Sequence, residues 1–125
     1  MQKIAIVDDA ADNSEFLYYL LRDHYSVAIY ESGEDMLGRI RTDPPDLIIM
    51  DIWLHGMDGS EVLGRIRQDE ALRKVTIVAL TANAMAGDRE KYLAAGFDEY
   101  VSKPILDIEK FFATLRHLLL PIEPK

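Results

Sequence analysis

Five short apolar runs recur along the 125-residue chain, and a segment of helical length separates each run from the next. The runs are rich in Ile, Val and Leu without polar alternation, which is typical of parallel strands covered on both faces. They span residues 3–7, 26–30, 47–50, 75–80 and 99–101. Apolar residues at helical spacing predict helices over residues 13–22, 34–40, 60–66, 89–95 and 108–119. This alternation predicts an α/β fold, a doubly wound five-stranded parallel sheet with helices on both faces.

The ends of the predicted helices carry local signals of their own. Ser32 and Ser60 are predicted N-caps, because a serine hydroxyl accepts a hydrogen bond from a first-turn N–H. Gly96 is typical of a residue that ends a helix. The last helix is predicted to bury Ile108, Phe111, Phe112, Leu115 and Leu119. Because Pro121 ends that helix, we predict one domain over residues 1–120 and a C-terminal stub or linker start at 121–125.

The composition excludes several classes of protein. The absence of cysteine rules out disulfides, thiolate metal sites and thiol catalysis. A net charge of −8 with scattered Lys and Arg disfavours direct binding to nucleic acid. No apolar stretch is long enough to cross a bilayer, and the first residues lack the pattern of a signal peptide. We therefore expect a cytoplasmic protein that does not bind membranes.

Residues able to do chemistry follow the predicted strands. Asp8 and Asp9 follow the first strand, Asp51 the third, Thr81 the fourth and Lys103 the fifth. In a doubly wound sheet these strand ends meet at one edge, where ligands bind. Three carboxylates brought together there repel one another unless a cation is present, and oxygen ligands that leave room for a phosphoryl group favour Mg²⁺. Taken singly, each of these residues is more often a helix cap, a turn residue or solvated surface.

Three stretches of the sequence resemble a known family. The stretches IAIVDDAADN, DLIIMDIWLHGMDG and VALTANAMAGDREKYLAAGFDEYVSKPI resemble, in this order, the receiver domain of two-component response regulators. This CheY-like family has the flavodoxin-like (βα)5 fold with strand order 2-1-3-4-5. The resemblance covers almost the whole chain, and it implies a switching module of phosphorelay signalling that turns over no external metabolite.

The resemblance implies a role for each residue at the sheet edge. Asp51 corresponds to the phosphoacceptor, and Lys103 to the residue that contacts the phosphoryl oxygens. The peptide bond between Lys103 and Pro104 corresponds to one that is cis in this family. The implied Mg²⁺ ligands are Asp8, Asp9, Asp51 and the backbone carbonyl of Trp53. Thr81 and Tyr100 correspond to the switch hydroxyl and the switch aromatic residue.

The same resemblance implies partners. A sensor histidine kinase or a histidine phosphotransfer protein would supply the phosphoryl group. An unknown downstream protein would bind the surface formed by the fourth helix, the fifth strand and the fifth helix, and phosphorylation could also produce a homodimer there. The sequence of residues 80–105 resembles the receivers of relay proteins and hybrid kinases more than those of transcription factors. Met1 favours a natural N-terminus, either of a single-domain regulator or of the first domain of a longer protein.

Two positions in the loop after Asp51 depart from the family pattern. His55 stands where a proline is common, and we interpret it as a solvated side chain rather than a ligand. Trp53 is large for its position, and our hypothesis is that it shields an acyl phosphate from water. A phosphohydrolase of the aspartyl-phosphate type would instead carry D-x-D after its first strand, and a nucleotide module would carry a glycine-rich phosphate loop. A third alternative keeps the fold as an interaction domain without phosphorylation.

Overall fold

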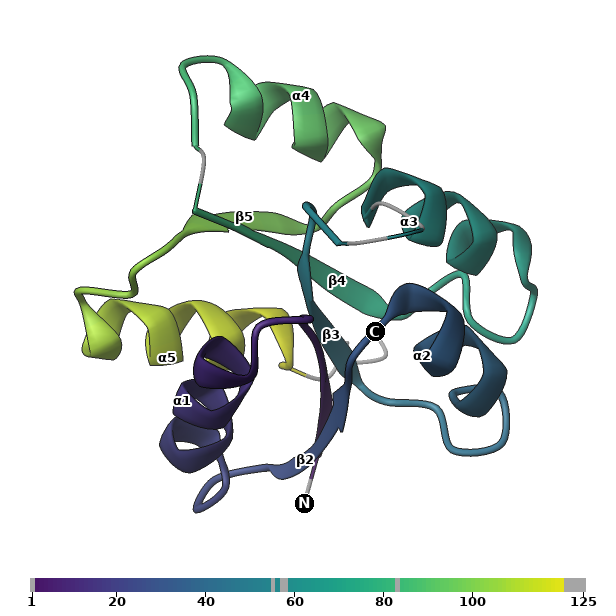
Figure 1. The fold of residues 1–125 in the computed structure, drawn as a ribbon, viewed down its shortest axis with the longest axis horizontal. Helices are drawn as coiled ribbons and strands as arrows, with labels where there is room; N and C mark the ends of the chain where they lie inside the picture. Colours follow the sequence, from purple (N-terminus) through teal and green to yellow (C-terminus); the bar gives the residue numbers. More distant parts are fainter. Residues whose placement is uncertain (1, 55, 57–58, 83, 121–125) are drawn as a thin grey trace, which may run out of the picture.

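The computed structural model describes residues 2–54, 56, 59–82 and 84–120, and they form a five-stranded parallel sheet flanked by five helices (Figure 1). The strands are β1 (Lys3–Val7), β2 (Ser26–Tyr30), β3 (Leu47–Asp51), β4 (Thr76–Thr81) and β5 (Glu99–Ser102). The helices are α1 (Ala11–Leu21), α2 (Gly33–Arg39), α3 (Gly59–Gln68), α4 (Asp88–Ala95) and α5 (Ile108–Leu118). The spatial strand order is β2-β1-β3-β4-β5, which confirms the predicted fold class and topology.

The sheet divides the core into two layers, because successive side chains of a strand point to opposite faces. In β1, Ile4 and Ile6 pack in the layer formed with α1 and α5. Ala5 and Val7 pack in the other layer, under α2, α3 and α4 (Figure 1). The central strand β3 is buried along its whole length, which explains its continuous apolar sequence.

Three strands run one residue further than their apolar residues predict. Asp51, Thr81 and Ser102 are the last residues of β3, β4 and β5. They stay in the sheet because the parallel ladder continues, with Asp51 opposite Leu80 and Thr81 opposite Ser102. The polar side chains at this edge are therefore held by strand backbone rather than by loops.

The helix ends confirm two predicted signals and correct a third. The Ser32 hydroxyl accepts a hydrogen bond from the Asp35 N–H at 3.0 Å, and Gly96 ends α4 with a φ of 123°. Ser60 is not an N-cap, because α3 already begins at Gly59. A Cβ at Gly59 would lie 2.7 Å from the Cα of Ile52, so the helix starts where only glycine allows this close approach.

The buried face of α5 also differs from the prediction at one position. Phe111, Leu115 and Leu119 are buried and Phe112 is half-buried, but Ile108 is 42% exposed. Ile108 occupies the first turn, directly after the N-cap Asp107, and the contact with the sheet begins one turn later. Among the described residues, no helix combines the length and apolar character needed to cross a membrane.

Candidate functional site

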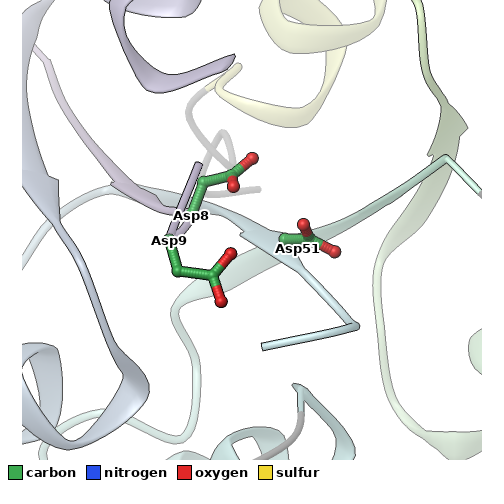
Figure 2. A group of neighbouring side chains, drawn as sticks. All are labelled: Asp8, Asp9 and Asp51. Carbon is green, nitrogen blue, oxygen red and sulfur yellow. The ribbon is translucent and has the colours of Figure 1, made fainter. Parts of the chain in front are cut away.

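Three carboxylates meet where β1 and β3 end (Figure 2). Asp8 follows β1 directly and is only 2% exposed, whereas Asp9 beside it is exposed. Asp51 ends β3 and is 8% exposed. One oxygen from each carboxylate lies within 4.8 Å of the others. The predicted convergence of these acids is therefore present in the folded chain.

Backbone N–H groups orient the two buried carboxylates. Oδ1 of Asp8 accepts a hydrogen bond from the N–H of Ala10 at 2.9 Å. Oδ1 of Asp51 accepts one from the N–H of Trp53, also at 2.9 Å. In both cases the acceptor lies two residues before the donor, so the turn that leaves the strand fixes the carboxylate. The second oxygen of each acid is left to face the site.

Lys103 joins the two buried acids. Its Nζ donates to Oδ2 of Asp8 at 2.9 Å and to Oδ2 of Asp51 at 3.0 Å, and its side chain is only 12% exposed. The backbone N–H of Lys103 donates to the carbonyl of Thr81 at 2.7 Å, and the Lys103–Pro104 peptide bond is cis. Sequence reasoning put Lys103 at this edge but did not predict that it bridges Asp8 and Asp51.

The surroundings of Lys103 act on its pKa in opposite directions. Burial of the ammonium is the largest single influence, and it lowers the pKa. The hydrogen bonds that Lys103 donates to Asp8 and Asp51, together with their negative charges, raise it by more in sum. The pKa of Lys103 therefore lies above its usual value, and the ammonium stays charged in the folded protein at neutral pH.

We expect the metal-free wild type to lose stability at alkaline pH more steeply than the variant Lys103→Met. Because the folded-state pKa is raised, the contribution of Lys103 is complete below its unfolded value of about 10.4 and is lost as the pH rises through the folded value. Urea unfolding in EDTA across this pH range measures the effect. Lys110→Met, which removes an exposed lysine of α5, serves as control and should keep the wild-type slope. Equal slopes for wild type and Lys103→Met would contradict the expectation.

Thr81 and Tyr100 lie on neighbouring strands beside this cluster. Thr81 ends β4 and is fully buried. Tyr100 lies in β5, opposite Ala79 of β4, and its ring stacks on that of Tyr92 in α4. Sequence reasoning missed Tyr92, whose only signal is that it is the single aromatic residue of its helix, DREKYLAA.

The loop after Asp51 contributes an exposed aromatic side chain. Trp53 is 58% exposed, so its indole lies outside the core. Its backbone N–H donates the hydrogen bond to Asp51 described above. The assignment of its carbonyl as a metal ligand stays a prediction. His55 lies outside the described residues.

Comparisons with known proteins agree with this geometry. The response regulator receiver domain family matches residues 4–116. The polar-differentiation response regulator DivK of Brucella ovis is 37% identical over 123 residues, which cover 94% of this chain and 96% of DivK. The signal transduction histidine-protein kinase BarA of Shigella flexneri is also 37% identical, over 97% of this chain but only 13% of BarA.

A solved structure carries both the fold and a metal. The receiver domain of the sensor histidine kinase PA1611 from Pseudomonas aeruginosa PAO1 superimposes with a TM-score of 0.84 and 34% identity, over 94% of this chain and 97% of that one. That structure has a magnesium ion coordinated in its active site cleft. The chain described here belongs to the response regulator receiver domain family, whose members are CheY-like signalling domains of two-component systems rather than classical enzymes.

Proposed function

We propose that this domain accepts a phosphoryl group on Asp51 from a histidine kinase or a histidine phosphotransfer protein. The observation that carries the proposal is the position of the Asp51 carboxylate. It lies at the end of a buried strand, beside two further carboxylates, and accepts a hydrogen bond from Lys103. A carboxylate oxygen of Asp51 would form the new bond to phosphorus while the bond from phosphorus to the donor nitrogen breaks. The product is an acyl phosphate on Asp51 and a free histidine on the donor.

The acidic cluster fits a Mg²⁺ ion by the chemistry of its donors. Asp8, Asp9 and Asp51 each offer a carboxylate oxygen within 4.8 Å of the others, and Mg²⁺ prefers such hard oxygen ligands together with water. The carbonyl of Trp53 is the proposed fourth ligand from the chain. When bound, the ion would offset the negative charge of the carboxylates and of the incoming phosphoryl group.

Lys103 is proposed to stabilise the transferred group. Its ammonium already contacts Asp8 and Asp51, and a raised pKa keeps it charged at neutral pH. A phosphoryl group on Asp51 would bring about −1.5 to −2 further charges and strong acceptor oxygens to the same position. Lys103 can then exchange its bond with the Asp51 carboxylate for bonds with those oxygens, which carry more charge.

Thr81 and Tyr100 are proposed to pass the change to the surface. The hydroxyl of Thr81 would move toward the phosphoryl oxygens, and Tyr100 would fill the space that it leaves. Tyr100 borders a cavity of about 590 Å³ that is lined by Arg89 of α4, by β5 and by residues at the start of α5. We propose this α4–β5–α5 surface as the site for a downstream protein or for a second copy of the domain after phosphorylation. We also propose that the protein is cytoplasmic and that it does not bind nucleic acid directly.

The decisive experiment is the intact mass of the protein after incubation with acetyl phosphate, with Mg²⁺ or with EDTA. The expected result is a gain of one phosphoryl group that requires Mg²⁺ and that hydroxylamine removes, because hydroxylamine cleaves acyl phosphates but not phosphate esters. No gain under either condition would contradict the proposal and favour an interaction domain that works without phosphorylation.

Trp53 is expected to lengthen the life of the acyl phosphate. Its exposed indole stands two residues after Asp51, where it can limit the approach of water to the phosphorus. Replacement by alanine should therefore raise the dephosphorylation rate several-fold, measured as the decay of the phosphorylated mass after the donor is removed. Tyr19→Ala, which removes an exposed aromatic ring of α1, is a matched control. An unchanged decay rate in Trp53→Ala would show that the indole does not shield the site.

A further inference from the structure

Tyr100 is held by a second aromatic ring from α4. The rings of Tyr92 and Tyr100 stack with their centroids 5.8 Å apart and their planes within 6° of each other. Tyr92 is 8% exposed and is the buried residue of its helix. Its ring also forms a T-shaped contact with the ring of Phe97, with the two centroids 5.9 Å apart. The ring of Tyr92 is thus a fixed surface against which the ring of Tyr100 rests, where α4 packs beside β5 (Figure 1).

The hydroxyl of Tyr100 is buried, and no described residue forms a well-aligned hydrogen bond with it. Burial raises the pKa of Tyr100, and the nearby carboxylate of Asp88, through its negative charge and as a hydrogen-bond acceptor, raises it further. The ring of Tyr100 is therefore positioned by its contact with Tyr92, and its hydroxyl lies near Asp88.

We propose that Tyr92 is a positioning residue for the switch, whose ring holds Tyr100 in the inward orientation before any phosphoryl group arrives. Inward denotes the observed orientation, with the ring of Tyr100 stacked on that of Tyr92 and its hydroxyl buried. This inference rests on the proposed function, because it assigns the resting state of the residue that we propose as the switch.

The backbone connects Tyr100 to the acidic cluster. Tyr100 lies three residues before Lys103, whose N–H is bonded to the carbonyl of Thr81. If phosphorylation favours the inward orientation, an inward bias favours phosphorylation by the same factor, since linkage is reciprocal. An aromatic pair contributes enough to shift such an equilibrium by about two- to tenfold. Loss of the Tyr92 ring should therefore weaken the binding of a phosphoryl group, or of a mimic of one, at Asp51 by that factor.

The test is fluorine NMR of protein labelled with 3-fluorotyrosine, in which Tyr100→Phe identifies the Tyr100 resonance among the six tyrosines. In the resting wild type this resonance should show little response when H₂O is replaced by D₂O. In Tyr92→Leu it should move and become sensitive to the solvent, as for an exposed ring. Tyr92→Phe, which keeps the ring and removes only its hydroxyl, should behave as the wild type. A resonance unchanged in Tyr92→Leu, or changed equally in Tyr92→Phe, would overturn the proposal.

A second measurement separates the failure of this inference from that of the proposed function. Beryllofluoride with Mg²⁺, which mimics a phosphoryl group, is titrated while the fluorescence of the single tryptophan, Trp53, is followed. Tyr92→Leu should bind it about two- to tenfold more weakly than the wild type. If no variant binds beryllofluoride, the proposed function fails, while the fluorine spectra still decide the resting role of Tyr92.

Discussion

Asp51→Asn is expected to abolish the Mg²⁺-dependent gain of a phosphoryl group from acetyl phosphate. An amide oxygen is a far weaker nucleophile than a carboxylate and gives no stable acyl phosphate, so the loss should be complete. The side chain keeps its shape, and its single oxygen can still accept the hydrogen bond from the Trp53 N–H, while Lys103 loses its bond to residue 51 and keeps its bond to Asp8. The fold should therefore persist, and the effect can be read as chemistry. Intact mass spectrometry and far-ultraviolet circular dichroism measure the two properties.

A matched control for Asp51→Asn is Asp12→Asn. Asp12 lies in the first turn of α1 and is exposed, so its replacement removes the same charge without removing the acceptor. Asp12→Asn should gain the phosphoryl group as the wild type does. A gain that persisted in Asp51→Asn would mean that another residue is the acceptor, and the proposed role of Asp51 would be wrong.

The second large effect is expected for stability, in Arg67→Met. The guanidinium of Arg67, at the end of α3, donates to the carbonyls of Arg73, Val75 and Gly96 and to the carboxylate of Asp98, at 2.6 to 3.0 Å. It thereby joins the end of α3 to the entry of β4 and to the loop between α4 and β5. Hydrogen bonds to a charged group contribute about 1.5–3 kcal/mol each. Because Asp98 is 41% exposed, water replaces part of this stabilisation. We therefore expect Arg67→Met to lower the free energy of unfolding by about 2–4 kcal/mol.

Urea unfolding of three variants tests the role of Arg67. Arg65→Met removes an exposed arginine of the same helix and should change the free energy of unfolding by less than about 0.5 kcal/mol. Arg67→Lys keeps the charge but not the planar group that reaches several acceptors at once, so it should recover less than half of the loss. If Arg67→Met were as stable as Arg65→Met, these four contacts would contribute nothing to the fold.

Much of the fold follows from patterns that are local in the sequence. The run LIIM at residues 47–50 has no polar alternation because β3 is covered on both faces along its whole length. The hydroxyl of Ser32 and the glycine at position 96 act within a few residues of themselves, so their effects on the helix ends were predictable. The convergence of Asp8, Asp9 and Asp51 was also predictable, because parallel strands bring their carboxyl ends to one edge.

Features that depend on distant partners were not predictable in the same way. Asp51 is the last residue of β3, and not the first residue of the following loop, because its backbone pairs with Leu80 of β4. Ser60 falls inside α3 because Gly59 packs against Ile52, which moves the start of the helix. Ile108 is exposed because the contact between α5 and the sheet begins a turn later. In each case a residue outside the element, or the edge of the sheet, changes the result of a local rule.

The sequence by itself therefore determined the α/β class, the elements and the edge at which the acidic residues gather, because hydrophobic period and strand direction are properties of short segments. Only the tertiary structure decided which charges and rings meet. Lys103 contacts Asp8 from 95 residues away, and Tyr92 stacks on Tyr100 from another element. Such contacts depend on the relative placement of whole helices and strands, which the close packing of the core sets and which no local pattern encodes.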